Sequence, residues 1–155
     1  MCFECVNVSR RRFMSFAATG AAAAGLWTMG GALSPSFAKT SLSADDALAK
    51  LKAGNQKFVS SPQLCAAELT NNRTAVAKGQ SPWATILTCA DSRVSPELIF
   101  GGVGLGELFV CRNAGNVADT AVMGTIEYGA EHLGSPLVVV MGHSRCGAVQ
   151  AACDV

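Results

Sequence analysis

Short apolar runs alternate with longer amphipathic segments along most of this chain. The segment that follows Ser43 places its apolar residues on one stripe of a helix, and the two acidic residues near its start favour a helix N-terminus. The members of this stripe are Ala44, Ala47, Leu48, Leu51 and Phe58. A second helix is expected to end at Lys78 and Gly79, because a cation followed by glycine is typical of a helix C-terminus.

Three shorter apolar runs are too brief for helices and predict strands. They cover residues 83–88, 108–111 and 137–141. Ser95 followed by Pro96 predicts a short helix after the first run. Asp119 is expected to cap a longer helix that Gly134 closes. Strands that alternate with helices indicate an α/β fold, in which a parallel sheet carries helices on its flanks.

The first 38 residues have the pattern of an export signal. Ser9-Arg10-Arg11-Arg12-Phe13-Met14 places paired arginines before an apolar residue, and an uncharged stretch rich in Ala and Gly follows at 16–33. Ser36-Phe37-Ala38 then offers small residues to a signal peptidase, so we expect a twin-arginine signal that is cut after Ala38. The alternative is a retained membrane anchor, but the stretch is weakly hydrophobic and a cleavage site follows it directly.

This interpretation predicts a bacterial protein that is exported to the periplasm and keeps no stable membrane anchor after cleavage. The chain of 155 residues is long enough for one domain, which is expected to occupy residues 39–155. The net charge of +1 includes the arginines of the signal, so the remainder is slightly acidic. Because no basic stripe remains, nucleic acid is not an expected partner.

Five of the seven cysteines lie outside the signal. An exported protein often pairs its cysteines in disulfides. Cys89 and Cys146 are instead interpreted as metal ligands, because of the motifs in which they lie. Cys111 lies inside an apolar run and is interpreted as a small core residue. Cys65 and Cys153 have no assigned role.

Two short motifs carry the candidate chemistry: Cys89-Ala90-Asp91-Ser92-Arg93 and His143-Ser144-Arg145-Cys146-Gly147. Each motif follows an apolar run, so Cys89 and His143 are expected just past the carboxyl end of a strand. These ends share one edge of a parallel sheet, and side chains 54 residues apart can therefore meet in one coordination sphere. Two thiolates, an imidazole and a carboxylate form a zinc ligand set.

Asp91 and Arg93 distinguish a catalytic metal site from a structural one. A closed site of two cysteines, a histidine and Asp91 has no use for an arginine that competes for the carboxylate. If Arg93 holds Asp91, the fourth position on zinc is free for water. We favour the catalytic interpretation, and a non-catalytic zinc-binding protein with Asp91 permanently on the metal stays open as the alternative.

The two motifs resemble those of the β-class carbonic anhydrases, and the resemblance runs from residue 42 to the end. It extends to three supporting segments: Gly54-Asn55-Gln56-Lys57-Phe58, Pro96-Glu97-Leu98-Ile99-Phe100 and Arg112-Asn113-Ala114-Gly115-Asn116. The resemblance implies zinc bound by the residues Cys89, His143 and Cys146. It also implies a catalytic dyad of Asp91 and Arg93, with Asp91 as a zinc ligand only in a closed, inactive state.

The activity implied by the resemblance is the reversible hydration of carbon dioxide to bicarbonate and a proton, and the full-length form is expected to be a homodimer or higher homo-oligomer. A hydrolase of carbon disulfide type on the same zinc scaffold is the rival activity. Two departures from the family pattern stand out: Gly101-Gly102 replaces a frequently acidic position, and the sequence stops at Val155 within the helix expected after Cys146. We therefore expect residues 39–155 to be an incomplete catalytic domain of the β-carbonic anhydrase type, which lacks the C-terminal part of the fold and forms an active dimer poorly.

Overall fold

The structure, a computed structural model, describes residues 39–68 and 73–154. The signal predicted for residues 1–38 lies outside the described residues. Helices and strands alternate along the described chain. Their bounds are α2 Ala44–Ser60, α3 Pro62–Ala67, α4 Arg73–Val76, β1 Ala84–Cys89, α5 Pro96–Ile99, β2 Leu108–Asn113, α6 Thr120–Glu131, β3 Val138–Met141 and α7 Gly147–Cys153. In this part of the chain, none of the helices combines the length and the apolar character needed to span a bilayer.

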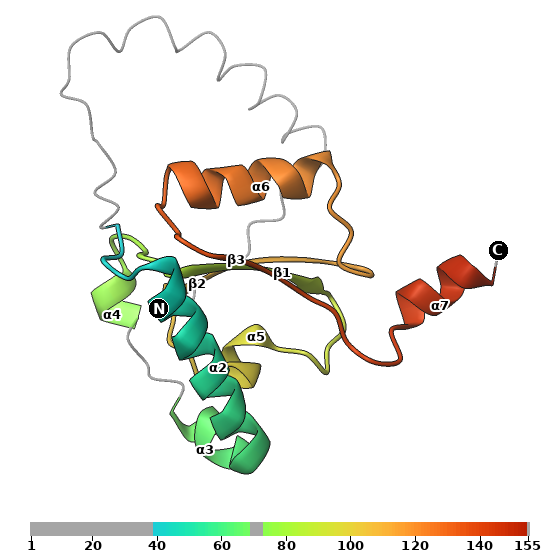
Figure 1. The fold of residues 1–155 in the computed structure, drawn as a ribbon, viewed down its shortest axis with the longest axis horizontal. Coiled ribbons are helices and arrows are strands. Elements are labelled where there is room, and N and C mark those ends of the chain that lie inside the picture. The colour runs from blue at the N-terminus through green and yellow to red at the C-terminus, as the bar shows by residue number, and fades with distance from the viewer. Residues whose placement is uncertain (1–38, 69–72, 155) are drawn as a thin grey trace, which may run out of the picture. The chain divides into compact units, whose positions relative to one another are not determined.

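The three strands form one parallel sheet in the order β2-β1-β3, as predicted for an α/β fold (Figure 1). Ala84 of β1 is in register with Leu108 of β2, and Thr85 is in register with Val138 of β3. All six residues of the central strand β1 are buried, whereas β2 and β3 contain half-buried and exposed positions. The central strand is therefore the best-covered platform for a functional site.

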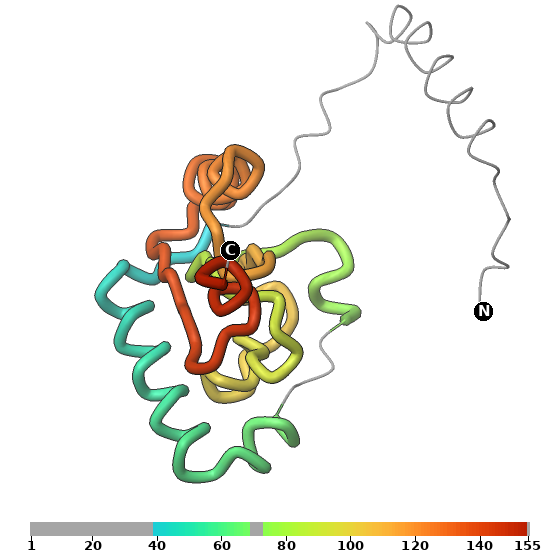
Figure 2. The backbone as a smooth tube through the Cα atoms, turned by 90° about the vertical axis from the view of Figure 1, so that its right-hand side faces the viewer, coloured from blue at the N-terminus to red at the C-terminus, as the bar shows by residue number. Residues whose placement is uncertain are grey.

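Helices cover both faces of this sheet. α6 lies on one face and contacts β1 and β2, while α2 and α5 lie on the other face (Figure 1). The hydrophobic core on the α2 side joins this helix to β1 and to the segments beside it. Its buried members are Ala47, Leu51, Trp83, Ala84, Ile86 and Val103. α7 follows β3 at the carboxyl end of the sheet and faces the viewer in Figure 2.

The prediction for α2 is correct at its start but partly wrong about its buried face. Ser43 caps the helix, because its hydroxyl oxygen accepts a hydrogen bond of 3.1 Å from the backbone N–H of Asp46. Within the predicted stripe only Ala47 and Leu51 are buried, and Leu48 is 37% exposed. Only a narrow strip of the helix surface, which includes Ala47, Leu51 and Gly54, lies against neighbouring elements. The apolar residues beside this strip therefore remain in contact with solvent.

The second predicted helix ends earlier than expected. α4 ends at Val76, and the backbone N–H of Gly79 donates to the carbonyl of Val76 at 3.2 Å in the turn that follows. Gly79 is not among the described glycines with positive φ, so it does not provide the left-handed helix end that was predicted.

The remaining elements follow the sequence pattern closely. The side chain of Asp119 accepts a hydrogen bond of 2.9 Å from the N–H of Val122 at the start of α6, and Gly134 after this helix has a φ of +67°. Ser95 stands at the N-terminus of α5 as predicted, but its hydroxyl donates to Glu97 at 3.1 Å and makes no capping bond. The strands begin or end within two residues of the predicted positions.

Candidate metal centre

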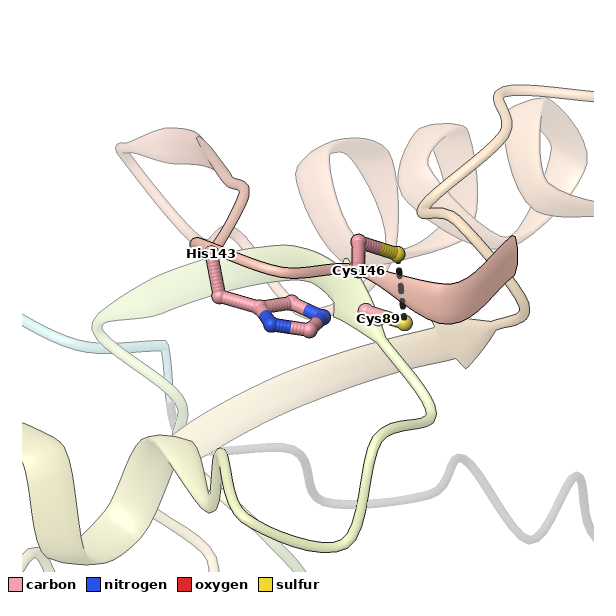
Figure 3. A group of neighbouring side chains, drawn as sticks. All are labelled: Cys89, His143 and Cys146. Atoms are coloured by element: carbon pink, nitrogen blue, oxygen red, sulfur yellow. Dashed lines mark hydrogen bonds between the residues drawn. The ribbon is translucent and has the colours of Figure 1, made fainter. Parts of the chain in front are cut away.

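The central strand and its neighbour β3 place the two motifs side by side. Cys89 was expected just past the carboxyl end of β1, but it is the last residue of this strand. His143 follows the end of β3. Cys146 stands at the start of α7. The sulfur atoms of Cys89 and Cys146 are 3.8 Å apart, and one ligand atom from each of the three side chains lies within 4.8 Å of the others (Figure 3).

His143 shows that this group fits a metal ion. Its Nδ1 lies 3.1 Å from the carbonyl oxygen of Ser144, which places the ring proton on Nδ1. Its Nε2 is buried and has no hydrogen-bond partner among the described residues. Figure 3 shows one ring nitrogen directed toward the two sulfurs. A buried nitrogen lone pair beside two sulfurs is satisfied by a metal ion, and two thiolates with an imidazole suit zinc.

The surroundings of Cys89 stabilise its thiolate, the form that binds metal. The pKa of Cys89 is lowered to about 6, first by the backbone N–H of Gly115, then by the neighbouring imidazole of His143 and by the backbone N–H of Asp91. The Gly115 nitrogen lies 3.4 Å from the Cys89 sulfur. The pKa of His143 is raised, mainly by Cys89. The chain therefore prepares a negatively charged ligand at the end of its central strand.

Asp91 lies beside the three ligands but is held by Arg93. The Arg93 guanidinium donates from Nε to Oδ1 at 2.8 Å and from Nη2 to Oδ2 at 2.6 Å, and the Arg93 backbone N–H adds a bond of 2.9 Å to Oδ1. Mainly because of this side chain, the pKa of Asp91 lies well below its usual range. Oδ2 is 3.8 Å from Nε2 of His143. The Asp91 carboxylate is therefore an ionised hydrogen-bond acceptor at the edge of the ligand group.

Arg93 also links the two ligand loops, which the sequence did not reveal. Its Nη2 donates to the carbonyl oxygen of Arg145 at 3.2 Å. Arg145 has a φ of +56°, a left-handed conformation that is uncommon for residues other than glycine. This conformation of the His143–Cys146 loop presents the carbonyl to the arginine of the Cys89 loop.

Arg112 is a second contact that sequence reasoning missed. It lies on β2, in register with Thr88 of β1, and donates to the carbonyl oxygens of Cys89 and Asp91. The position of Arg112 in the sequence could have predicted this contact. A long polar side chain near the carboxyl end of a strand that neighbours β1 can reach the loop that follows β1.

The other described cysteines and His132 stay outside the ligand group. Cys65 and Cys111 are buried free thiols and Cys153 is an exposed one, and the burial that raises the pKa of Cys111 agrees with its predicted place in the core. His132 directly follows α6 as its C-cap, and the centre of its ring lies 5.2 Å from that of Tyr128.

A cleft of about 490 Å³ opens beside the metal ligands. It extends from the ligand loop along α7. Its lining residues are His143, Arg145, Cys146, Gly147, Val149, Gln150 and Cys153. Small molecules can therefore approach the ligand group from the α7 side.

Comparison with known proteins agrees with this geometry. Residues 84–155 match the family model described as carbonic anhydrase. Carbonic anhydrase 2 of Mycobacterium tuberculosis is 50% identical over 102 residues, which are 66% of this chain and 49% of that protein. The carbonic anhydrase of Mycolicibacterium smegmatis is 46% identical over 101 residues, 65% of this chain and 48% of the relative.

A solved structure shows a similar fold. The β-carbonic anhydrase of Coccomyxa in complex with acetazolamide is 38% identical, with a TM-score of 0.50 over 68% of this chain and 47% of that chain. The chain spans about half the length of the curated relatives that it matches. In its sequence and in its parallel sheet with flanking helices, and with a ligand group suited to zinc, the described chain is similar to the β-carbonic anhydrases.

Proposed function

We propose that this chain is a zinc-dependent carbonic anhydrase that interconverts carbon dioxide and water with bicarbonate and a proton. The observation that carries the proposal is the Asp91–Arg93 pair. Its carboxylate lies beside the three ligands, but both of its oxygens are bound by the guanidinium. This arrangement leaves three protein ligands for the metal, the number found in catalytic zinc sites. The sequence relatives named carbonic anhydrase support the same function.

The protein's own residues would bind the metal and control a proton. Zinc bound by Cys89, His143 and Cys146 would lower the pKa of a water molecule toward ~7 and make it a nucleophile. Asp91 remains ionised, so it can only accept a hydrogen bond at the centre. Arg93 holds both carboxylate oxygens and thereby sets the direction from which Asp91 accepts.

The cleft along α7 would admit the substrate. Val149 and Gly147 give it an apolar part that suits carbon dioxide, and the exposed Arg145 adds a positive charge that would attract the bicarbonate product. The ligands His143 and Cys146 line the same cleft, so the substrate would reach the nucleophile directly.

Replacement of Asp91 by asparagine tests the activity and the role of the dyad. Asp91→Asn keeps the shape of the side chain but removes the charged acceptor, so we expect zinc content to be unchanged and kcat/KM for carbon dioxide hydration to fall by ~10²-fold or more. Stopped-flow hydration assays and metal analysis measure the two quantities. Full activity of Asp91→Asn would show that the dyad is not catalytic.

The same preparations separate the alternatives. Turnover of carbon disulfide in place of carbon dioxide would favour the hydrolase. X-ray absorption that shows two sulfurs, one nitrogen and one carboxylate on zinc at every pH, with no turnover, would favour a non-catalytic zinc protein.

We also propose that residues 1–38 direct export to the periplasm by the twin-arginine pathway. The support is the order of paired arginines, an uncharged stretch and small residues before Lys39. In cell fractionation, the protein should move from the periplasm to the cytoplasm when Arg10 and Arg11 are both replaced by lysine. A periplasmic double variant would contradict this route.

A homo-oligomer is the assembly that we propose for the active protein. β3 is an edge strand of the described sheet, and its Val138 and Val140 are 43% and 63% exposed. Exposed apolar side chains along an open strand edge favour association. Because residues 39–155 alone are expected to dimerise poorly, sedimentation velocity is measured on a zinc-loaded protein extended to the length of the relatives, and a monomer at all concentrations would contradict the proposal.

A further inference from the structure

Arg112 makes two hydrogen bonds to the loop that carries the metal ligand Cys89. Its Nε donates to the carbonyl oxygen of Cys89 at 3.0 Å, and its Nη2 donates to the carbonyl oxygen of Asp91 at 2.7 Å. The two acceptors are separated by Ala90 and lie on either side of it in the chain. A planar guanidinium with donors in a fixed fork can hold two such carbonyls at once, whereas a lysine presents its donors from a single nitrogen.

The chain around Arg112 is itself firmly held to the same loop. The backbone N–H of Ala90 donates to the carbonyl of Asn113 at 2.8 Å, which continues the pairing of β1 and β2 beyond Cys89. The amide side chain of Asn113 forms a pair of bonds with the backbone of Val117, at 2.7 and 2.8 Å. Gly115 then directs its N–H at the Cys89 sulfur. The segment from Arg112 to Gly115 therefore contacts the Cys89 loop at several points, and Arg112 contributes side-chain hydrogen bonds to this contact.

We propose that Arg112 is a positioning residue for the metal centre: its guanidinium orients the Cys89 thiolate and the Asp91 carboxylate by fixing the backbone carbonyls on both sides of Ala90. The inference rests on the proposed zinc site. Both of these hydrogen bonds of Arg112 end on backbone carbonyl oxygens, so it acts on the two side chains through the backbone. Partners of this kind set the direction of a ligand, and their removal typically lowers metal affinity or activity 10–100-fold.

The geometry distinguishes Arg112 from Arg93, which orients the same residue. Arg93 binds the side-chain oxygens of Asp91 and links them to Arg145 of the second loop. Arg112 binds the main chain of Asp91 and links it to Cys89. Together the two arginines hold Asp91 at both ends, one at the carboxylate and one at the backbone.

The test compares the variants Arg112→Lys and Arg112→Gln with the wild-type chain. Zinc affinity is measured by competition with a chelating dye, and the ligand geometry is followed by the absorption bands of the Co²⁺-loaded protein. We expect Arg112→Gln to weaken zinc binding by about 10–100-fold and to change the Co²⁺ spectrum. Arg112→Lys, which can satisfy one carbonyl at a time, should fall between Arg112→Gln and wild type.

Arg73→Gln is the matched control, because it removes an exposed arginine from α4, outside the ligand group. This variant should keep wild-type zinc affinity and Co²⁺ bands. The thermal unfolding midpoints of all metal-free variants should agree, which separates positioning from a general loss of stability. If Arg112→Gln does not fold, Arg112→Lys decides the question by itself.

Two outcomes would overturn the proposal. One is wild-type zinc affinity with an unchanged Co²⁺ spectrum in both Arg112 variants. The other is a loss of affinity that accompanies an equal loss of stability in the metal-free form, because Arg112 would then support the fold in general. Failure of the wild-type protein to hydrate carbon dioxide would contradict the proposed function, but it would leave these metal-binding measurements interpretable.

Discussion

Cys89 illustrates, at the scale of single residues, how a strand end prepares a metal ligand. Backbone N–H groups of Gly115 and Asp91 and the imidazole of His143 all stabilise the negative charge on its sulfur. Cys111, on the neighbouring strand, is buried without such donors, and its pKa is raised. The same residue type is therefore a ligand in one position and a core residue in the other, because hydrogen-bond donors surround only the first.

The lowered pKa of Cys89 predicts how its reactivity depends on pH. In the metal-free protein the group loses its proton as pH rises through about 6, so alkylation by iodoacetamide should reach half of its maximal rate near that pH. Peptide mapping by mass spectrometry measures the modification of each cysteine separately. Saturating zinc should protect Cys89, and a half-maximal rate near the ordinary value of 9.0 would contradict the prediction.

At the scale of elements, glycines decide how closely α2 can pack. A Cβ atom at Gly54 would lie 2.0 Å from the carbonyl oxygen of Phe100, at the end of α5. A Cβ atom at Gly101, which has a φ of +96°, would in turn lie 2.7 Å from the Cα atom of Gly54. The supporting segments 54–58 and 96–100 thus meet in space, and the absence of side chains at this point brings α2 against α5.

Replacement of Gly54 by alanine should therefore destabilise the protein. The added methyl group would overlap backbone atoms that cannot move independently, so we expect a loss of ~1–3 kcal/mol in the free energy of unfolding. Gly124→Ala is the matched control, because a Cβ at this position of α6 meets no atom within 4 Å. The control should gain ~0.5–1 kcal/mol from helix propensity. Urea unfolding followed by circular dichroism measures both, and equal effects would contradict the packing argument.

At the scale of the whole molecule, the metal centre joins parts of the chain that are far apart in sequence. Cys89 belongs to the central strand, whereas His143 and Cys146 belong to the connection between β3 and α7. A bound metal ion would therefore crosslink the centre of the sheet to its last described helix. Metal binding contributes to folding whenever the unfolded chain lacks the assembled site.

Removal of zinc should lower the stability of the protein. With free zinc at 100 times its Kd, the folded state gains ~2.7 kcal/mol over the metal-free state. Chemical unfolding in the presence of zinc and after chelation measures this difference. Cys146→Ser, which removes one thiolate, should reduce the effect of zinc, and an equal effect in the wild type and this variant would show that zinc binds elsewhere.

Much of the fold could be predicted from the sequence, because hydrophobic periodicity reports which side of an element is buried. The three strands and the caps at Ser43 and Asp119 lie where the pattern indicated. The exposed Leu48 shows the limit of this reasoning, because an apolar stripe does not reveal how wide the contact with neighbouring elements is. The end of α4 was misplaced because Gly79 can close a simple turn as readily as a helix.

The sequence by itself determined the types of the ligands and their place at strand ends. Only the tertiary structure decided that β1 and β3 are neighbours, which brings the sulfurs of Cys89 and Cys146 to 3.8 Å. The left-handed backbone of Arg145 and the reach of Arg112 to the Cys89 loop also became visible only in three dimensions. Strand order and backbone dihedral angles depend on contacts between distant segments, and local patterns of residues do not specify them.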